Sequence, residues 1–384
     1  MADTPTDVST DWIARARRLV ADLSRPRPVV YWTDLFVSLA IGVSAASIHL
    51  LQPWLSPAQL VAWLVAGIAL FRAALFMHEI VHFRRGEMRG FTAAWNLLFG
   101  IPFMMPSFCY EHHLVHHNAR HYGTPRDGEY LPLGTARPWV TAAFLAEIAV
   151  LPLLAVIRFL VITPVSFLHP RLRQWALERC SPLVINPWHR REIPADAPRR
   201  LWAMTELLCF GQALVLATLP FVTTVRVGQV EVPLGWPALV KLYLIAVLAL
   251  GLNHVRTLVA HRYRSDGMTM TFAEQLDDSI NVEGRTPLVV LMFPVGLRYH
   301  ALHHLFPFIP YHDLGIAHRR IMRELPDWRA YRAATYPSFA AALADFVRGM
   351  RESCPWRPAG AAGWFARLRD GRGPSLPSRP SRAA

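Results

Sequence analysis

The chain has 384 residues, of which 53% are hydrophobic and only 17% are charged. Soluble domains carry about a quarter charged residues, so this composition argues against an ordinary soluble protein and indicates that much of the surface faces lipid. The formal net charge of +13 comes almost entirely from arginines. Because these arginines flank apolar runs, as the positive-inside rule expects, they argue against a nucleic-acid-binding protein.

The N-terminal segment, residues 1–29, is polar and carries several arginines ahead of the first apolar run. We predict an amphipathic helix over residues 11–23 (DWIARARRLVADL) that lies at the membrane surface and stops before the prolines that follow. Because no short apolar core is followed by a cleavage site, the sequence predicts no signal peptide.

Four apolar runs predict membrane crossings. The first extends from Val30 to Leu51, and the second from Ala58 to Met77 after the turn PWLSP. The third and fourth, 201–224 and 236–259, flank the sequence RVGQVEVPLG, which predicts a short hairpin connection. Each run has about the 20 residues that a helical crossing needs.

The apolar stretch 138–168 is harder to assign, because it contains Glu147, Arg158, Pro152 and Pro164. Histidine clusters follow the second crossing and the last one. They can share one side of the membrane only if 138–168 crosses an even number of times. We therefore predict an interfacial helix pair or a re-entrant segment here, and the same for 91–108 and 286–297.

These elements predict an all-α integral membrane protein with four transmembrane helices, interfacial helices and a cytoplasmic cap that holds the histidines. Four crossings put both termini on one side, which the arginine-rich N-terminus marks as cytoplasmic. We expect a membrane domain over 30–330, a cytoplasmic helical extension over 331–354 and a disordered tail over 355–384, apart from a short stretch around 364–368. The scarcity of lysine is typical of a GC-rich bacterial genome and favours a bacterial inner membrane.

Three histidine clusters stand out. The first, HEIVH, places His78 and His82 one turn apart on one helical face at the end of the second crossing, so both imidazoles can reach one metal. The second, EHHLVHH, and the third, HALHH, each contain the pattern HxxHH, which is too rare to arise twice by chance. The residues of these two patterns are His113, His116, His117, His300, His303 and His304.

This number of clustered imidazoles indicates two metal ions with open coordination positions. A closed structural zinc site needs about four ligands, commonly with cysteine, and the cysteines here are scattered without a CxxC pair. Neutral imidazole suits iron, copper, zinc and nickel, so ligand type alone does not name the metal. A metal transporter would place ligands along a path near mid-membrane. These clusters lie at the ends of crossings, which argues against transport.

A ninth ligand is expected near the end of the fourth crossing, where Asn253, Thr257 and His261 share one helical stripe. We favour His261 over the deeper His254, although a histidine that merely anchors the membrane interface fits the sequence equally well. The polar residues that could orient the ligand imidazoles are Glu79, His112, Asn253 and Asp278.

The set HEIVH, HLVHH and HALHHLFP resembles the three histidine boxes of the membrane fatty acid desaturase superfamily, in the family's order and with two crossings between the last two boxes. The resemblance covers about residues 30–330. It implies two non-haem iron ions that are bound by the histidines of the three boxes, joined in the acyl-CoA branch by a further histidine on the fourth crossing. It also implies O2 as co-substrate. In the acyl-CoA branch that histidine lies four residues after an asparagine, whereas here His261 lies eight residues after Asn253.

The second cluster is also similar to the EHxxxHH pattern of membrane alkane monooxygenases, with Glu111, His112, His116 and His117 as the matching residues. Those enzymes insert oxygen where desaturases remove hydrogen. The continuation HHLFP after the third cluster favours the desaturases.

By this resemblance we expect an oxidoreductase, an O2-dependent di-iron fatty acyl desaturase that introduces a C=C bond into an alkyl chain. The alternative is a membrane di-iron hydroxylase of alkyl, ceramide or carotenoid substrates, and a histidine-rich metal transporter is a weaker third hypothesis. The expected substrate is a lipid or an acyl thioester. Because no HPGG-type haem signature is present, electrons are expected from a separate ferredoxin- or cytochrome-like donor.

Overall fold

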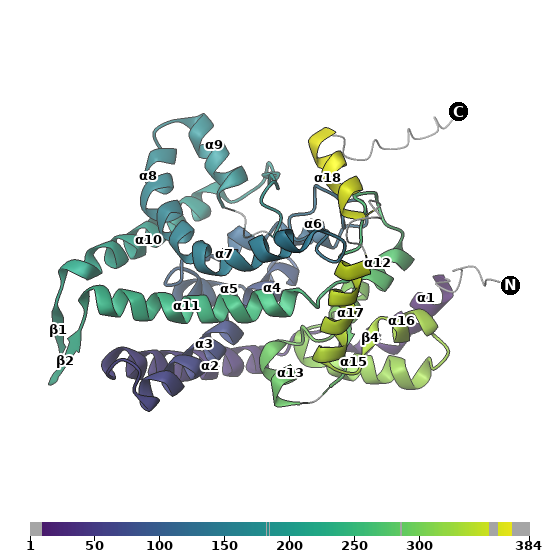
Figure 1. Ribbon diagram of the computed structural model, residues 1–384, viewed down its shortest axis with the longest axis horizontal. Coiled ribbons are helices and arrows are strands. Elements are labelled where there is room, and N and C mark those ends of the chain that lie inside the picture. Colours follow the sequence, from purple (N-terminus) through teal and green to yellow (C-terminus); the bar gives the residue numbers. More distant parts are fainter. Residues whose placement is uncertain (1–9, 182, 184, 285, 353–359, 371–384) are drawn as a thin grey trace.

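The computed structural model describes residues 10–181, 183, 185–284, 286–352 and 360–370. Long helices run along the longest axis of the molecule (Figure 1). The short helices of a cap gather at one end of these long helices, and a two-stranded hairpin lies at the other end (Figure 1).

The first two predicted crossings form a helical hairpin. Its elements are α2 (Pro28–Leu51), α3 (Pro57–Ala74) and α4 (Phe76–His82), which continues α3 after a break at Leu75. The Ser56 side chain accepts a hydrogen bond from the backbone N–H of Gln59 and so caps α3. The helices pack closely because Gly42 leaves room for Leu70, which would lie 2.7 Å from a Cβ at that position.

The stretch 138–168 forms one long bent helix instead of the predicted interfacial pair. It consists of α7 (Pro138–Ile157), the π-helical turn η4 (Arg158–Ile162) and α8 (Thr163–Ser166), and α9 (Pro170–Arg179) follows. Among the described residues, five helical stretches are long and apolar enough to cross a membrane: Pro28–Leu51, Pro57–His82, Pro138–Ser166, Arg199–Phe221 and Gly235–Thr257. Arg158, one of the charged residues that argued against a long helix here, forms an ion pair with the buried Glu206 of α10 (Arg199–Thr218).

Both ends of this additional stretch lie beside the second histidine cluster. Just before it, the N–H of Gly134 donates to the carbonyl of Tyr263 at 3.1 Å. After α9, the N–H of Leu183 donates to Cys109 at 3.0 Å, and that of Asn186 donates to Gly128 at 2.9 Å. The chain therefore leaves one end of the bundle and returns to it, which satisfies the requirement for an even number of crossings.

The other two predicted crossings are α10 (Arg199–Thr218) and α11 (Gly235–Thr257), and the predicted hairpin connects them. The 3-10 turn η5 (Leu219–Phe221) leads into β1 (Thr224–Val227), which pairs antiparallel with β2 (Val230–Pro233). Gly228 takes a φ of +61° at the turn, a conformation that glycine adopts without strain. The hairpin lies opposite the cap (Figure 1).

The cap consists of short helices. After α4 come α5 (Arg89–Trp95), the π-helical η2 (Asn96–Gly100), η3 (Ser107–Tyr110) and α6 (His113–His116). After α11 come α12 (Phe272–Asp278), α13 (Pro287–Met292), α14 (His300–Leu305), α15 (Tyr311–Glu324), α16 (Arg329–Ala333) and α17 (Phe339–Glu352). The short strands β3 (Asn281–Val282) and β4 (Thr335–Tyr336) pair in parallel. The helices within 91–108 and 286–297 are thus too short to cross a bilayer.

The N-terminal helix forms as predicted but packs differently. Its elements are α1 (Thr10–Leu19) and the 3-10 turn η1 (Ala21–Leu23). The apolar side chains of Ala16 and Val20 are buried in one cluster with Ala317 and Ile321 of α15. The apolar face therefore packs on protein and not on lipid, because α15 offers it a complementary apolar surface.

Part of the predicted disordered tail is helical. α18 spans Gly360–Asp370, and Trp364 on it is 0% exposed, with its indole N–H donating to the carbonyl of Gly123 at 3.1 Å. The polar composition of the tail favoured disorder, but one buried tryptophan supplies the apolar contact that holds this helix. Residues 355–359 and 371–384 of that prediction lie outside the described residues.

Candidate metal centre

Histidine side chains meet in two groups where α4, α6, α14 and the segment after α11 converge. The first group is His78, His82, His113, His117 and His303, and the second group is His116, His261, His300 and His304. Within each group the ligand atoms lie within 4.8 Å of one another. The structure thus brings together every ligand predicted from the sequence. It includes His261, whereas His254 lies in neither group.

The two HxxHH patterns do not each build one group. In the second cluster, His113 and His117 join the first group, while His116 joins the second. In the third cluster, His300 and His304 join the second group, while His303 joins the first. Residues four apart share a helical face, so each pattern sends a pair to one group and a single histidine to the other.

Inside each group the imidazole Nε2 atoms point at one another. In the first group, the Nε2 atoms of His303 and His82 lie 3.1 Å apart. In the second, Nε2 of His261 lies 3.2 Å from that of His116 and 2.9 Å from that of His300. Neutral imidazoles cannot all donate to one another, because each has only one N–H. Converging lone pairs of this kind fit transition-metal ions.

The two groups are direct neighbours. The rings of His117 and His304, one from each group, stack with centroids 4.4 Å apart. The rings of His113 and His116, again one from each group, lie with centroids 5.5 Å apart. Two metal ions held by these groups would therefore share one centre.

Burial keeps most of these imidazoles neutral. It lowers the pKa well below the ordinary value of 6.5 for the cap histidines His113, His117, His261, His300, His303 and His304. Neutral imidazole is the form that binds metal. No carboxylate belongs to either group in the described part of the chain, in contrast to the soluble di-iron bundles with their glutamate ligands.

Asp127 orients His116. Its Oδ2 lies 2.8 Å from His116 Nδ1, and the N–H of Gly123 donates to the same oxygen at 3.0 Å. Burial acts to lower the pKa of His116, but the charge and hydrogen bond of Asp127, together with the charges of Glu129 and Asp278, raise that pKa above its ordinary value. His116 in turn holds the pKa of Asp127 low. A carboxylate on the second ring nitrogen fixes the tautomer that leaves Nε2 free for metal. Sequence analysis missed Asp127, although it is among the first acidic residues after the second cluster.

Tyr122 orients His261 and connects it to Asp278. The Tyr122 hydroxyl lies 2.7 Å from His261 Nδ1 and donates to Asp278 Oδ2 at 2.9 Å. The direct separation of His261 Nδ1 from Asp278 Oδ2 is 3.8 Å. Asp278 therefore supports the imidazole as predicted, but it acts through a tyrosine that the sequence did not reveal.

Two of the predicted orienting residues point elsewhere. Glu79 accepts hydrogen bonds from the Tyr31 hydroxyl at 2.6 Å and from the N–H of Tyr311 at 3.1 Å, and its distance to His78 Nδ1 is 3.9 Å. Asn253 accepts from the guanidinium of Arg256 at 3.1 Å. Both side chains are engaged by these partners, and in the described part of the chain neither forms a hydrogen bond to a histidine of the two groups.

The fourth, His112, is buried beside Glu129, with 3.6 Å between Nε2 and Oε1. Glu129 also lies 3.5 Å from Nδ1 of the ligand His113. Glu111 instead pairs with Arg191 at 2.7 Å. The alternative set that resembled alkane monooxygenases therefore does not converge, since Glu111 and His112 lie in neither histidine group.

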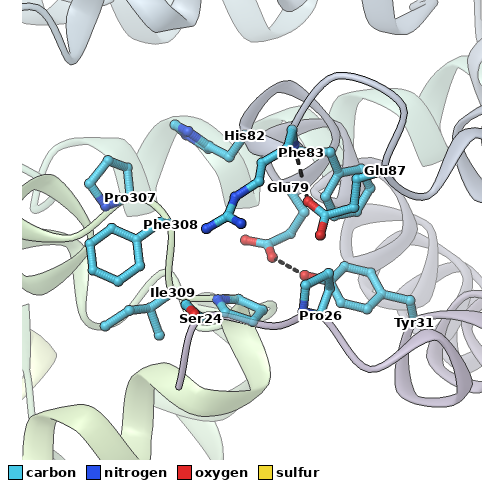
Figure 2. Close-up of a pocket in the computed structure, with 12 residues that line it drawn as sticks. Ser24, Pro26, Tyr31, Glu79, His82, Phe83, Glu87, Pro307, Phe308 and Ile309 are labelled. Carbon is cyan, nitrogen blue, oxygen red and sulfur yellow. Dashed lines mark hydrogen bonds between the residues drawn. The ribbon is translucent and has the colours of Figure 1, made fainter. Parts of the chain in front are cut away.

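A surface pocket reaches the outer edge of the first group (Figure 2). Glu79 and His82 line its inner end, and its rim includes Ser24, Pro26 and Arg84. Figure 2 shows the Glu79 carboxylate turned toward the Tyr31 hydroxyl, on the opposite side of the pocket from His82. His82 is thus the ligand of the first group that an outside molecule can approach through this pocket.

Comparisons with known proteins agree with this arrangement. The family model described as fatty acid desaturase matches residues 53–335. The chain is 37% identical over 357 residues to a ceramide hydroxylase of Caulobacter vibrioides, a match that covers 92% of this chain and 97% of that protein. No solved structure matches the chain.

Proposed function

Because the chain belongs to the fatty acid desaturase family, we propose that it is a membrane hydroxylase that inserts one oxygen atom into a hydrocarbon chain of a ceramide-like lipid. The observation that carries this proposal is the 37% identity to a ceramide hydroxylase over nearly the whole of both chains. It favours the hydroxylase alternative over the desaturase that the sequence first suggested.

The nine histidines would hold the metals of this oxidoreductase, five on one ion and four on the other. We propose iron for both, in keeping with the family, and bound iron with O2 would supply the oxidising power for an unactivated C–H bond that side chains alone cannot attack. The overall conversion is RH + O2 + 2 electrons + 2 protons to ROH + H2O. Asp127 and Tyr122 would keep the Nε2 atoms of His116 and His261 aimed at the centre.

The two electrons require a donor, which we propose is a separate protein. The pocket that His82 lines offers an approach to the histidines from outside. Arg25, Arg27, Arg84 and Arg85 are exposed around or next to its lining residues. An acidic donor would be attracted to such a rim, because opposite charges speed encounter and orient the partner. We propose that the pocket and the cap face the cytoplasm at a bacterial inner membrane, in keeping with the arginine-rich N-terminal segment beside the pocket.

The test is to express the chain in a bacterial host that is supplied with ceramide, and to analyse the extracted lipids by mass spectrometry. The control is His303→Ala, which removes a central ligand of the first group, and the matched variant is His169→Ala, an exposed histidine at the start of α9. We expect ceramide that has gained one oxygen from the unmodified chain and from His169→Ala, but not from His303→Ala.

Other products would separate the alternatives. A loss of two hydrogens in place of the gain of oxygen would make the protein a desaturase. Oxygen added to an acyl thioester or a free hydrocarbon, with ceramide untouched, would keep the hydroxylase reaction but reject the substrate. Equal product from the His303→Ala variant would reject the histidine centre.

A further inference from the structure

Arg256 lies in the last turn of α11 and lacks the partners that a guanidinium normally has. Its Nη2 donates to Asn253 Oδ1 at 3.1 Å and to Thr257 Oγ1 at 3.2 Å, both on its own helix. Its Nε is buried and has no hydrogen-bond partner. No carboxylate lies within ion-pair distance of it among the residues that the structure describes. A guanidinium offers five N–H donors, so most of its capacity is unused.

The other cationic side chains that are buried or half-buried in and beside the long helices are matched. Arg158 and Arg173 share the buried carboxylate of Glu206. Arg72 donates to Asp34 at 2.6 Å, and Lys241 donates to the carbonyl of Gln52 at 2.7 Å. A charged side chain within a membrane segment is costly unless it is paired, and an unpaired one generally marks a functional site. Arg256 therefore stands apart from these paired cations.

Arg256 also lies next to the metal centre. Its positive charge adds to burial in lowering the pKa of His261 and His300. Its neighbours include Tyr110, whose ring stacks on that of the ligand His113 with centroids 4.8 Å apart. Because α11 ends at Thr257, the guanidinium lies where the long helix meets the cap. The polar group of a lipid embedded in the bilayer would reach this level.

We propose that Arg256 binds the amide carbonyl oxygen of the lipid substrate, and that Asn253 holds the guanidinium in position for it. This rests on the proposed function, since the amide is the group that a ceramide-like lipid carries between its two hydrocarbon chains. The carbonyl oxygen can accept hydrogen bonds from the guanidinium N–H groups of Arg256 that have no partner on α11. With the amide held beside His261 and His300, a carbon close to the amide is presented to the metal centre, and carbons near the methyl ends are not.

The first experiment measures binding without turnover, on purified iron-loaded protein in detergent and without reductant. The probes are a short-chain fluorescent ceramide and its analogue in which the amide C=O is replaced by CH2. The variants are Arg256→Met and Arg256→Lys, with Arg264→Met as the matched control, because Arg264 is exposed and pairs with Asp345. Iron content and the unfolding midpoint are measured for each variant.

We expect Arg256→Met to weaken ceramide binding about 10- to 100-fold, the effect of losing hydrogen bonds from a charged donor. It should leave binding of the CH2 analogue unchanged. The ceramide affinity of Arg256→Lys should lie between that of the unmodified protein and that of Arg256→Met. Equal losses for both probes would show a structural role and overturn the proposal. So would unchanged ceramide binding in Arg256→Met, or failure of the unmodified protein to bind ceramide. If Arg256→Met loses its iron, Arg256→Lys is tested in its place with the same two probes, and its result decides.

Turnover then separates this inference from the proposed function. In the unmodified protein we expect the new hydroxyl, located by fragmentation, within a few carbons of the amide. Arg256→Lys should raise the KM for ceramide more than it lowers kcat and should spread the hydroxyl over more positions. Ceramide that binds through Arg256 but is never oxidised would reject the function and keep the subsite. Ceramide oxidised with the same KM and position in Arg256→Lys and Arg256→Met would keep the function and reject the subsite.

Discussion

The Nε2 atoms of His116 and His261 lie 3.2 Å apart, although 145 positions separate the two residues in the sequence. His116 belongs to an HxxHH pattern, whereas His261 belongs to no histidine cluster. Their approach places His261, the least certain of the predicted ligands, inside the second group.

The contact between His116 and His261 predicts that replacing His261 lowers the iron content, whereas replacing the nearby His254 does not. We expect His261→Ala to lose about half of the bound iron, because a metal site rarely survives the loss of one of its few protein ligands. His254→Ala should retain all of it, since His254 lies in neither group. Iron per chain, measured by plasma mass spectrometry on purified protein, tests this. Equal iron content in the two variants would remove His261 from the ligand set.

Asp127 predicts an effect on metal affinity without loss of a ligand. Asp127→Asn keeps the shape of the side chain but removes the charge that holds His116 Nδ1. We expect metal affinity in the second group to fall about 10- to 100-fold, as is typical when the outer partner of a metal-bound histidine is lost. Competition with a chelator measures it. Glu231→Gln, in an exposed ion pair on the far hairpin, is the control and should leave affinity unchanged.

The buried ion pairs of Glu206 predict an effect on stability. Glu206 is 0% exposed and pairs with Arg158 and Arg173. Glu206→Ala leaves the buried Arg158 and the half-buried Arg173 without their carboxylate and should lower the free energy of unfolding by about 3–5 kcal/mol. Glu178→Ala, which removes a pair with the largely exposed Arg190, should cost about 1 kcal/mol or less. Denaturant unfolding in detergent measures both, and similar losses would contradict the buried network.

The histidine pKa values predict how the metal-free protein responds to acid. Burial holds the pKa of His113, His300 and His303 below the ordinary 6.5 in the folded chain. Between those lowered values and 6.5 the unfolded chain binds more protons than the folded one, so the free energy of unfolding falls as pH falls. We expect the metal-free protein to be less stable at about pH 5.5 than at about pH 7.5. The same stability at both values, measured by denaturant unfolding, would contradict this.

Much of the bundle followed from the sequence, and the exceptions have physical causes. Runs of about 20 apolar residues have few structures available in a membrane other than helices, so the four crossings and the hairpin at 226–235 were predicted with nearly correct bounds. For 138–168, the parity of the crossings predicted an interfacial pair or a re-entrant segment, and the structure has one long helix whose flanking residues both contact the cap. Only the packing of α7–α9 on α10 brings Glu206 to Arg158. In the tail, the short stretch expected around 364–368 lies within α18, and the helix extends beyond it because Trp364 is held by a contact with the distant Gly123.

For the histidine groups, the sequence by itself singled out the eight histidines of the three clusters, because spacing along a helix decides which imidazoles share a face. The tertiary structure placed His261 with them. Only the tertiary structure decided how the histidines divide between two groups and that Tyr122 and Asp127 hold second ring nitrogens. It also decided that Arg256 forms no ion pair with any residue that the structure describes. Local spacing constrains residues within one helix. Contacts between residues more than a hundred positions apart depend on how the helices pack, which no short pattern in the chain records.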